Sequence, residues 1–263
     1  MDAGGGAMTL TFAALGEFGD AISFIFSSRE NQRGAPVGGS HNLPLLWEHL
    51  KLCGAAMGLA LLISLPLGLI LGHTGKGSFL AISTSNVGRA VPSVALIALF
   101  IAFLPSSPEF LNVTLALTLL AIPPILTNTY VGVRQTDRDS VDAARGMGMS
   151  GGEIIRSVEL PLALPLIFGG IKTSTVNVIA TATIAPLVGV VTLGDPLVAY
   201  SVYGREGRIG ASIIVAVLAI AAEVGLSAVQ RAVTPAGIKL ERGGDDPARA
   251  RFGLTKRRIQ TAP

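Results

Sequence analysis

Charged side chains are scarce in this sequence. Asp, Glu, Lys and Arg make up 14% of the 263 residues, whereas soluble domains contain about 25%. Half of the residues are hydrophobic, and the mean hydropathy is +0.60. A water-soluble globular enzyme is therefore disfavoured, and a disordered chain is excluded because disorder requires low hydrophobicity. The composition indicates a protein that resides in a membrane.

Residues that build disulfides, metal sites or nucleotide sites are also few. Cys53 is the single cysteine, so no internal disulfide can form. His41, His49 and His73 lack the spacing of metal ligands, and we expect no metal site. The sequence has no Gly-x-x-x-x-Gly-Lys-Ser/Thr loop, so ATP is not expected to bind here. We therefore expect neither a catalytic residue nor a cofactor in this chain, and no secretory signal is evident at its start.

Long charge-free stretches are present instead. A helix needs about 20 mainly apolar residues to cross a bilayer. The stretches predict an all-α polytopic membrane protein with five spans, at residues 52–72, 84–104, 110–133, 166–190 and 209–230. The second span is the weakest, because residues 77–89 are too polar for a separate crossing and are expected to extend this helix, with Pro92 bending it.

These spans divide the chain into three parts. Residues 46–231 are the predicted membrane domain, and residues 1–45 are a predicted extracytoplasmic segment. Apolar residues recur there at three- and four-residue steps from Phe12 to Ile25, which is typical of an amphipathic helix, here expected over 9–28 on the outer surface. The alternative is a sixth span, which would move the N-terminus to the cytoplasm.

The third part, residues 232–263, is a basic tail. Residues 231–263 carry eight Lys or Arg against three acidic residues, which gives +5 there and leaves −2 for the rest of a chain of net charge +3. A basic segment after a hydrophobic body typically marks a cytoplasmic end near anionic lipid, and this is favoured over the alternative, a nucleic-acid-binding tail. With five spans, fifteen Lys and Arg then lie inside and five outside, which places the N-terminus outside.

The most informative segment is the charged loop between the third and fourth predicted spans. Residues 141–165 read VDAARGMGMSGGEIIRSVELPLALP. Asp142 is expected to open a short helix, with its carboxylate near the positive N-terminal end. Gly148, Gly151 and Gly152 allow a sharp turn. Pro161 and Pro165 lie where a new helix begins. The loop is therefore expected to fold as a short cytoplasmic helix, a turn and the start of a membrane helix.

This pattern resembles the EAA loop of binding-protein-dependent ABC importer permeases. The family form is Glu-Ala-Ala, three residues, Gly, nine residues and Ile-x-Leu-Pro. This sequence has Asp for Glu, Val for Ile and the required glycine at the required step. The candidate ATPase-docking loop comprises Asp142, Ala143, Ala144, Gly146, Gly148, Val158, Leu160 and Pro161.

The resemblance extends over roughly residues 43–230, to the permeases that import osmoprotectants such as glycine betaine, carnitine, choline and proline. Stretches such as AIPPILTNTYVGV and VELPLALPLIFGGIKTSTV are similar to that subgroup. One departure is Val190-Val191-Thr192 before Leu193-Gly194-Asp195, where the subgroup tends to carry a Gly-rich GAGGLGD-like run. A permease for another small solute, such as an amino acid, is the nearest alternative, and an ATP-independent secondary transporter is a more distant one.

The resemblance implies a type I ABC importer permease fold in the cytoplasmic membrane, with five core helices. Its implied partners are separate ATPase subunits that use ATP, a second permease subunit (identical or homologous), and an extracytoplasmic substrate-binding protein. The chain itself would not be an enzyme.

Two further sets of residues are candidates for sites. Thr173, Asn177 and Thr181 recur every four residues on one helix face, and we expect them to line the translocation pathway; the alternative is a role in interhelical hydrogen bonds only. Trp and Tyr are few and dispersed, so an aromatic cage for a quaternary amine is expected on the binding protein. Tyr200, Tyr203 and Arg205 form a candidate docking surface for that protein, with a solvated loop as the alternative.

Small residues mark a packing face on the first predicted span. Gly54 and Gly58 are four residues apart, and so are Gly68 and Gly72. Both pairs match the spacing that allows close approach of membrane helices.

Overall fold

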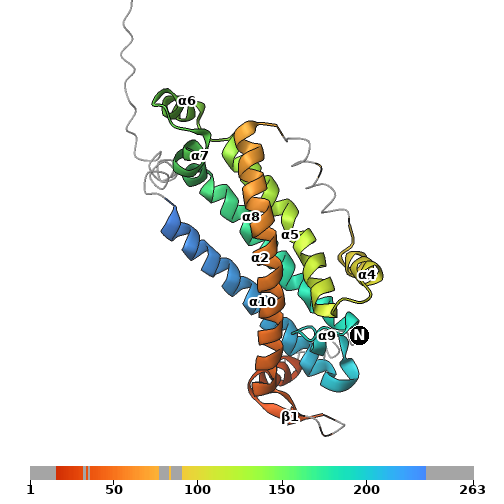
Figure 1. The fold of residues 1–263 in the computed structure, drawn as a ribbon. Helices are drawn as coiled ribbons and strands as arrows, with labels where there is room; N and C mark the ends of the chain where they lie inside the picture. Colours follow the sequence, from red (N-terminus) through yellow and green to blue (C-terminus); the bar gives the residue numbers. More distant parts are fainter. Residues whose placement is uncertain (1–15, 32–33, 35, 77–82, 84–90, 235–263) are drawn as a thin grey trace, which may run out of the picture.

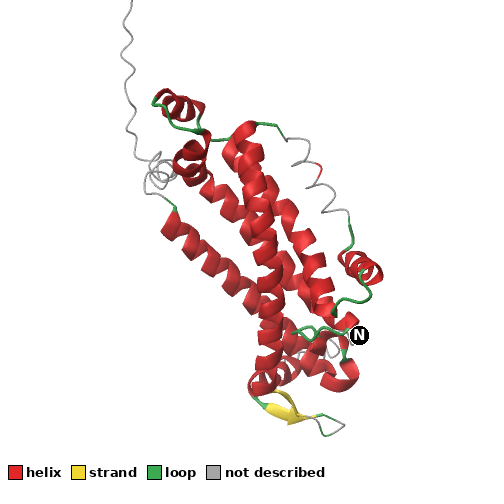
Figure 2. Cartoon of the chain, viewed as in Figure 1, coloured by secondary structure: helices red, strands yellow, loops and turns green. Residues whose placement is uncertain are grey.

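A computed structural model describes residues 16–31, 34, 36–76, 83 and 91–234. In this part of the chain the fold is a helical bundle with one two-stranded hairpin (Figures 1 and 2). Four of the described helical stretches are long and apolar enough to cross a membrane, namely Gly39–Thr74, Glu109–Arg134, Gly151–Val188 and Tyr200–Val233. The predicted class, an all-α membrane protein, is confirmed at this level.

The described elements follow one another along the chain in this order. Residues 16–26 are helical. The next elements are β1 (Ser28–Glu30), β2 (Pro36–Gly38), η1 (Gly39–His41), α2 (Asn42–Thr74), α4 (Ser93–Phe103) and α5 (Glu109–Arg134). The remaining elements are α6 (Arg138–Gly146), α7 (Gly151–Ile154), η2 (Ile155–Glu159, one π-helical turn), α8 (Leu160–Thr181), η3 (Ala182–Val188), α9 (Asp195–Val198) and α10 (Tyr200–Val233).

Helices α2 and α5 form the centre of the bundle and run parallel. The Thr118 hydroxyl of α5 donates a hydrogen bond to the carbonyl of Ala56 in α2. Further along both helices, Gly68 lies against Thr129 and Gly72 against Val133, so closely that a Cβ at either glycine would lie 2.6 Å from the partner's Cβ. Because the contacts advance in the same direction along both helices, the chain between them returns to the opposite end of the bundle.

The returning segment includes the second predicted span, residues 84–104. Residues 84–90 lie outside the described part, and the described helix is α4, with 11 residues. At 1.5 Å per residue α4 is about 16 Å long, whereas the hydrocarbon core is about 30 Å thick. The described residues therefore contain four helices long enough to cross a membrane and one shorter apolar helix, α4.

Helix α8 runs antiparallel to α5 and joins α10 to the bundle. The Ser174 hydroxyl donates to the carbonyl of Ala121 at 2.8 Å, and Gly170 packs against the Pro124 carbonyl. The ammonium of Lys172 donates to the side chain of Gln230 at 2.9 Å, which ties α8 to the far end of α10. Only 11% of the apolar window of α10 is buried in this subunit.

The N-terminal segment packs on the first turns of α10. Phe24 is fully buried against Gly207 and Gly210 and meets the ring of Tyr203 edge-on, with centroids 6.5 Å apart. Phe18 and Ile22 of the same helix are about half exposed, 56% and 50%. The described part of the predicted amphipathic helix is thus helical. One of its faces packs against α10, and the apolar side chains of another face are exposed. The helix ends at Phe26, slightly before the predicted limit of residue 28.

Candidate functional site: the α6–α7 loop and the outer cavity

Helix α6 begins at Arg138, with Asp137 as its N-cap. The carboxylate of Asp137 accepts hydrogen bonds from the backbone N–H and the hydroxyl of Ser140, at 3.0 and 2.7 Å, and these bonds hold the pKa of Asp137 below its ordinary value. The expectation that Asp142 opens this helix was wrong, because Asp137 already supplies the capping oxygen one turn earlier. Asp142 lies inside α6 and pairs with Arg145 at 3.3 Å.

The turn after α6 is fixed by glycine and by a capping box. Gly148 has φ +86°, a conformation that side-chain-bearing residues rarely adopt. The Ser150 hydroxyl then accepts from the backbone N–H of Glu153, and the Glu153 carboxylate accepts from the backbone N–H of Ser150 at 2.7 Å. Helix α7 therefore starts at Gly151 and continues through the π turn η2 into α8, as the predicted helix–turn–helix requires.

The loop residues divide into an inward and an outward set. Val141, Ala144 and Ile154 are buried together in a small cluster that Met149 and Val158 flank. Exposed side chains and open glycines cover the outward side; this set comprises Asp142, Ala143, Arg145, Gly146, Met147 and Gly148. Met147 is the most apolar of these and is 76% exposed. The outward side thus offers a contact surface to another molecule, while the inward cluster fixes α6 on α7.

Val158, Leu160 and Pro161, the last part of the predicted motif, lie where this loop enters α8. Val158 is in the π turn, and Leu160 and Pro161 are the first two residues of α8. Because α7, η2 and α8 are continuous, Pro161 lies inside a helical stretch, where it removes one backbone donor directly after the π turn. The π turn itself was not expected from the sequence.

Next to this turn, the structure pairs two residues that the sequence left unconnected. Glu159 is 2% exposed, and its Oε2 lies 2.8 Å from Nδ1 of His73 at the end of α2. The sequence could have indicated Glu159, since it is a carboxylate next to an apolar run. It could not indicate the partner, because 86 residues separate Glu159 from His73.

The polar stripe on α8 lies on an open side of the subunit. Thr173 and Asn177 are exposed and Thr181 is half-buried. The Thr173 hydroxyl bonds within its own helix, to the carbonyl of Gly169 at 3.0 Å. The hydrogen bond from α8 to α5 is made instead by Ser174.

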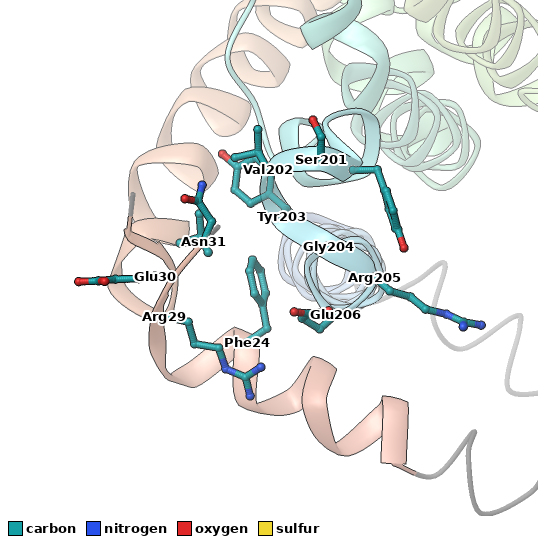
Figure 3. Close-up of a pocket in the computed structure, with 12 residues that line it drawn as sticks. Phe24, Arg29, Glu30, Asn31, Ser201, Val202, Tyr203, Gly204, Arg205 and Glu206 are labelled. Carbon is teal, nitrogen blue, oxygen red and sulfur yellow. The ribbon is translucent and has the colours of Figure 1, made fainter. Parts of the chain in front are cut away.

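At the opposite end of the bundle, an open cavity of about 560 Å³ lies between the N-terminal segment and the start of α10 (Figure 3). Tyr200, Tyr203 and Arg205 all line it, as the sequence grouped them. The other wall, including Phe24 and Arg29, comes from the N-terminal segment and was not foreseen.

Charged and aromatic groups fix the geometry around this cavity. Arg205 pairs with Glu17 at 2.8 Å, and the guanidinium of Arg208 lies 4.9 Å from the centroid of the Tyr200 ring. Gly204 interrupts α10 with φ +69°. In the nearby α9, burial raises the pKa of Asp195.

Comparison with known proteins decides the family. Residues 64–236 match the family described as the binding-protein-dependent transport system inner membrane component. The chain belongs to this family. It is therefore a multi-pass inner-membrane permease component rather than an ATPase, and the family implies a complex with an ATPase and a binding protein.

Several curated permeases are similar to this permease over most of their length. The glycine betaine/carnitine/choline transport system permease protein OpuCB of Bacillus subtilis (strain 168) is 36% identical over 193 residues, 73% of this chain and 88% of that protein. The choline transport system permease protein OpuBB of the same organism is also 36% identical, over 73% and 88% of the two chains. The osmoprotectant import permease protein OsmW of Salmonella typhimurium is 32% identical, over 74% and 93%.

Solved structures support the fold of the permease. An inward-facing structure of the MetNI methionine ABC transporter gives a TM-score of 0.65 at 21% identity, over 73% of this chain and 96% of that one. An amino acid ABC transporter with histidines gives 0.58 at 22% identity, over 72% and 92%. At these identities the similarity concerns the fold alone. No group of three or more His, Cys, Asp or Glu residues that could hold a metal ion occurs among the described residues.

Proposed function

We propose that the permease imports osmoprotectants such as glycine betaine, choline, carnitine or proline, driven by ATP hydrolysis in a separate subunit. The observation that carries this proposal is the similarity to OpuCB, OpuBB and OsmW at 32–36% identity over about three quarters of the chain. An amino acid remains the alternative solute, but the amino-acid transporters resemble this chain at only 21–22% identity.

The proposed topology has five crossings, with the N-terminus outside and the C-terminus in the cytoplasm. It is supported by the parallel arrangement of α2 and α5, because the chain between two parallel spans must cross back. In Figure 1, α6, α7 and the end of α10 lie at one end of the bundle, and the hairpin and α9 lie at the other. The excess of Lys and Arg in the tail and the loop assigns the first of these ends to the cytoplasm.

The α6–α7 loop is the proposed docking element for the ATPase. Its outward set of residues projects from the cytoplasmic end, and its inward cluster and caps hold the two short helices as one body. Such a body can transmit displacement, since packed side chains resist compression.

The polar stripe of α8 is proposed to line the solute pathway at the contact with a second permease subunit, identical or homologous. Polar groups at membrane depth are expensive unless they have partners or water. The stripe is exposed in this subunit, and α8 bonds to α5 through Ser174 instead. Water in a solute pathway would therefore supply hydrogen-bond partners for the polar groups of the stripe. The outer cavity, with Tyr200, Tyr203 and Arg205, is the proposed contact for the binding protein.

Reconstitution of the permease with its ATPase and binding protein in liposomes tests the proposal. Glycine betaine, choline, carnitine and proline are compared with methionine as radiolabelled solutes. We expect uptake that requires ATP enclosed in the vesicle, because uptake needs the ATPase on the inner face and the binding protein outside. We also expect preference for the first group of solutes. Uptake that persists without the ATPase would establish a secondary transporter, and preference for methionine would overturn the substrate class.

A further inference from the structure

We propose that His73 and Glu159 form a latch that transmits movement of the ATPase-docking loop directly to α2. The inference rests on the proposed function of that loop. Helices α6 and α7 and the π turn η2, residues 138–159, together form the docking unit. The latch gives positioning roles to His73, which lies outside the EAA pattern, and to Glu159, which occupies the variable position of its Ile-x-Leu-Pro element.

The imidazole of His73 contacts the docking unit at two points. Its Nδ1 lies 2.8 Å from Oε2 of Glu159, where an Nδ1–H donates to the carboxylate. Its Nε2 faces the first residue of α7, because a Cβ at Gly151 would lie 3.1 Å from this atom. Glycine at position 151 therefore leaves the room that the ring needs between the start of α7 and the end of η2.

The carboxylate of Glu159 is buried and therefore depends on its hydrogen bond with His73. It is 2% exposed, while the side chain of His73 is 19% exposed. A buried carboxylate is costly unless it is paired and hydrogen-bonded. The pair is thus a fixed connection and not one of the exposed ion pairs that contribute little.

The docking unit is packed as one body. Val141 and Ala144 of α6 are buried with Ile154 of α7, and the capping box fixes the start of α7. The unit is joined covalently to α5 through residues 135–137 and to α8 at Leu160. The second of these links is a π turn, an element that is often found at functional sites. The latch adds a third connection, to α2.

Helix α2 is placed to pass the movement on. Gly72 lies one residue before the latch and packs directly on Val133 of α5, with Gly68 on Thr129 one turn earlier. These contacts leave no room for the two helices to slide closer. With the latch, a displacement of the docking unit therefore acts directly on α2 as well as on α5 and α8. Without it, the displacement reaches α5 and α8 through the chain, and α2 only through its packing on α5.

The test uses the full importer in liposomes and measures solute imported per ATP hydrolysed. His73→Phe keeps an aromatic ring but removes the donor, and His73→Asn restores an N–H near the Nδ1 position. We expect His73→Phe to lower the ratio about tenfold, the size of one lost hydrogen bond to a charged group, and His73→Asn to recover most of it. An unchanged ratio in His73→Phe, or equal losses in both variants, would overturn the latch.

A second variant covers the case in which His73→Phe fails to assemble. The double substitution His73→Phe with Glu159→Met removes the unpaired buried carboxylate and lets the site pack as an apolar contact. We expect this complex to assemble, to hydrolyse ATP and still to import little solute per ATP. Full recovery of the ratio would overturn the latch, because it would show that His73 only offsets the cost of burying the Glu159 carboxylate. A wild-type complex without ATP-driven uptake would refute the proposed function instead, which separates the two failures.

Discussion

Replacing Gly68 by alanine tests the close contact between α2 and α5. The new Cβ would lie 2.6 Å from Cβ and 2.7 Å from Cγ2 of Thr129, and 3.2 Å from the carbonyl oxygen of Leu126. Two of these neighbours are on a β-branched side chain and the third is backbone, so none can rotate away. Overpacking of this kind costs about 1–3 kcal/mol.

The same helix supplies a matched control. Gly54 and Gly58 have the spacing of Gly68 and Gly72, yet a Cβ at either meets nothing within 4 Å. Alanine at these two positions gains about 0.5–1 kcal/mol of helix propensity with no steric cost. Because this gain is common to both substitutions, the difference between Gly68→Ala and Gly54→Ala is the steric cost, about 1–3 kcal/mol.

Thermal unfolding of the full chain in detergent measures this difference. A change of 1 kcal/mol shifts the midpoint of a chain of this size by roughly 2–4 °C. We expect Gly68→Ala to unfold at a lower temperature than wild type, and Gly54→Ala at the same or a higher temperature. Equal midpoints for the two variants would show that α2 and α5 do not meet at Gly68.

Three further predictions concern the loop, the pathway and the outer cavity. Because the hydrogen bonds from Ser140 lower the pKa of Asp137, the cap stabilises α6 at neutral pH and its contribution is lost as the pH falls through that lowered pKa; Asp137→Asn should remove this acid dependence of ATPase docking, and an unchanged profile in pull-down assays would refute it. Asn177→Leu should raise the KM or lower the maximal rate of uptake several-fold, since it removes a polar group from the pathway; unaltered kinetics would leave the stripe no transport role. Arg205→Glu should reduce several-fold the stimulation of ATP hydrolysis by the binding protein, while Glu17→Gln, which breaks the ion pair but keeps Arg205, should reduce it less; equal stimulation in all three proteins would exclude docking at the cavity.

Hydropathy predicted the long helices because lipid imposes a strong requirement on a spanning segment. Its side chains must be apolar, and its backbone N–H and C=O groups must be hydrogen-bonded within the segment. The third span, residues 110–133, agrees with α5 to within one residue at each end. Some helices extend beyond the predicted spans, as α10 begins at Tyr200 and the predicted span at residue 209. Hydropathy does not mark these extensions, since they lie in the more polar part of the sequence.

Local chemistry and tertiary packing explain what the sequence did not reveal. The sequence pointed to Asp142 as the residue that opens α6, whereas the hydrogen bonds from Ser140 identify Asp137 as its cap. The two glycine pairs of α2 have identical spacing, but the partner helix covers only Gly68 and Gly72. The outer cavity likewise needs the N-terminal segment, which is remote in sequence from α10. In each case the deciding contact is made by residues that no periodicity connects.

The parallel packing of α2 and α5 has a consequence for biogenesis. The hydrogen bond from Thr118 to Ala56 spans 62 residues of sequence, and chains are synthesised at about 5–20 residues per second. Helix α2 therefore enters the lipid roughly 3–12 seconds before its partner is made. During that interval the glycine face of α2 presents bare backbone to lipid or to the insertion machinery. The central helix pair of this permease can thus form only after the whole segment between the two helices has been synthesised.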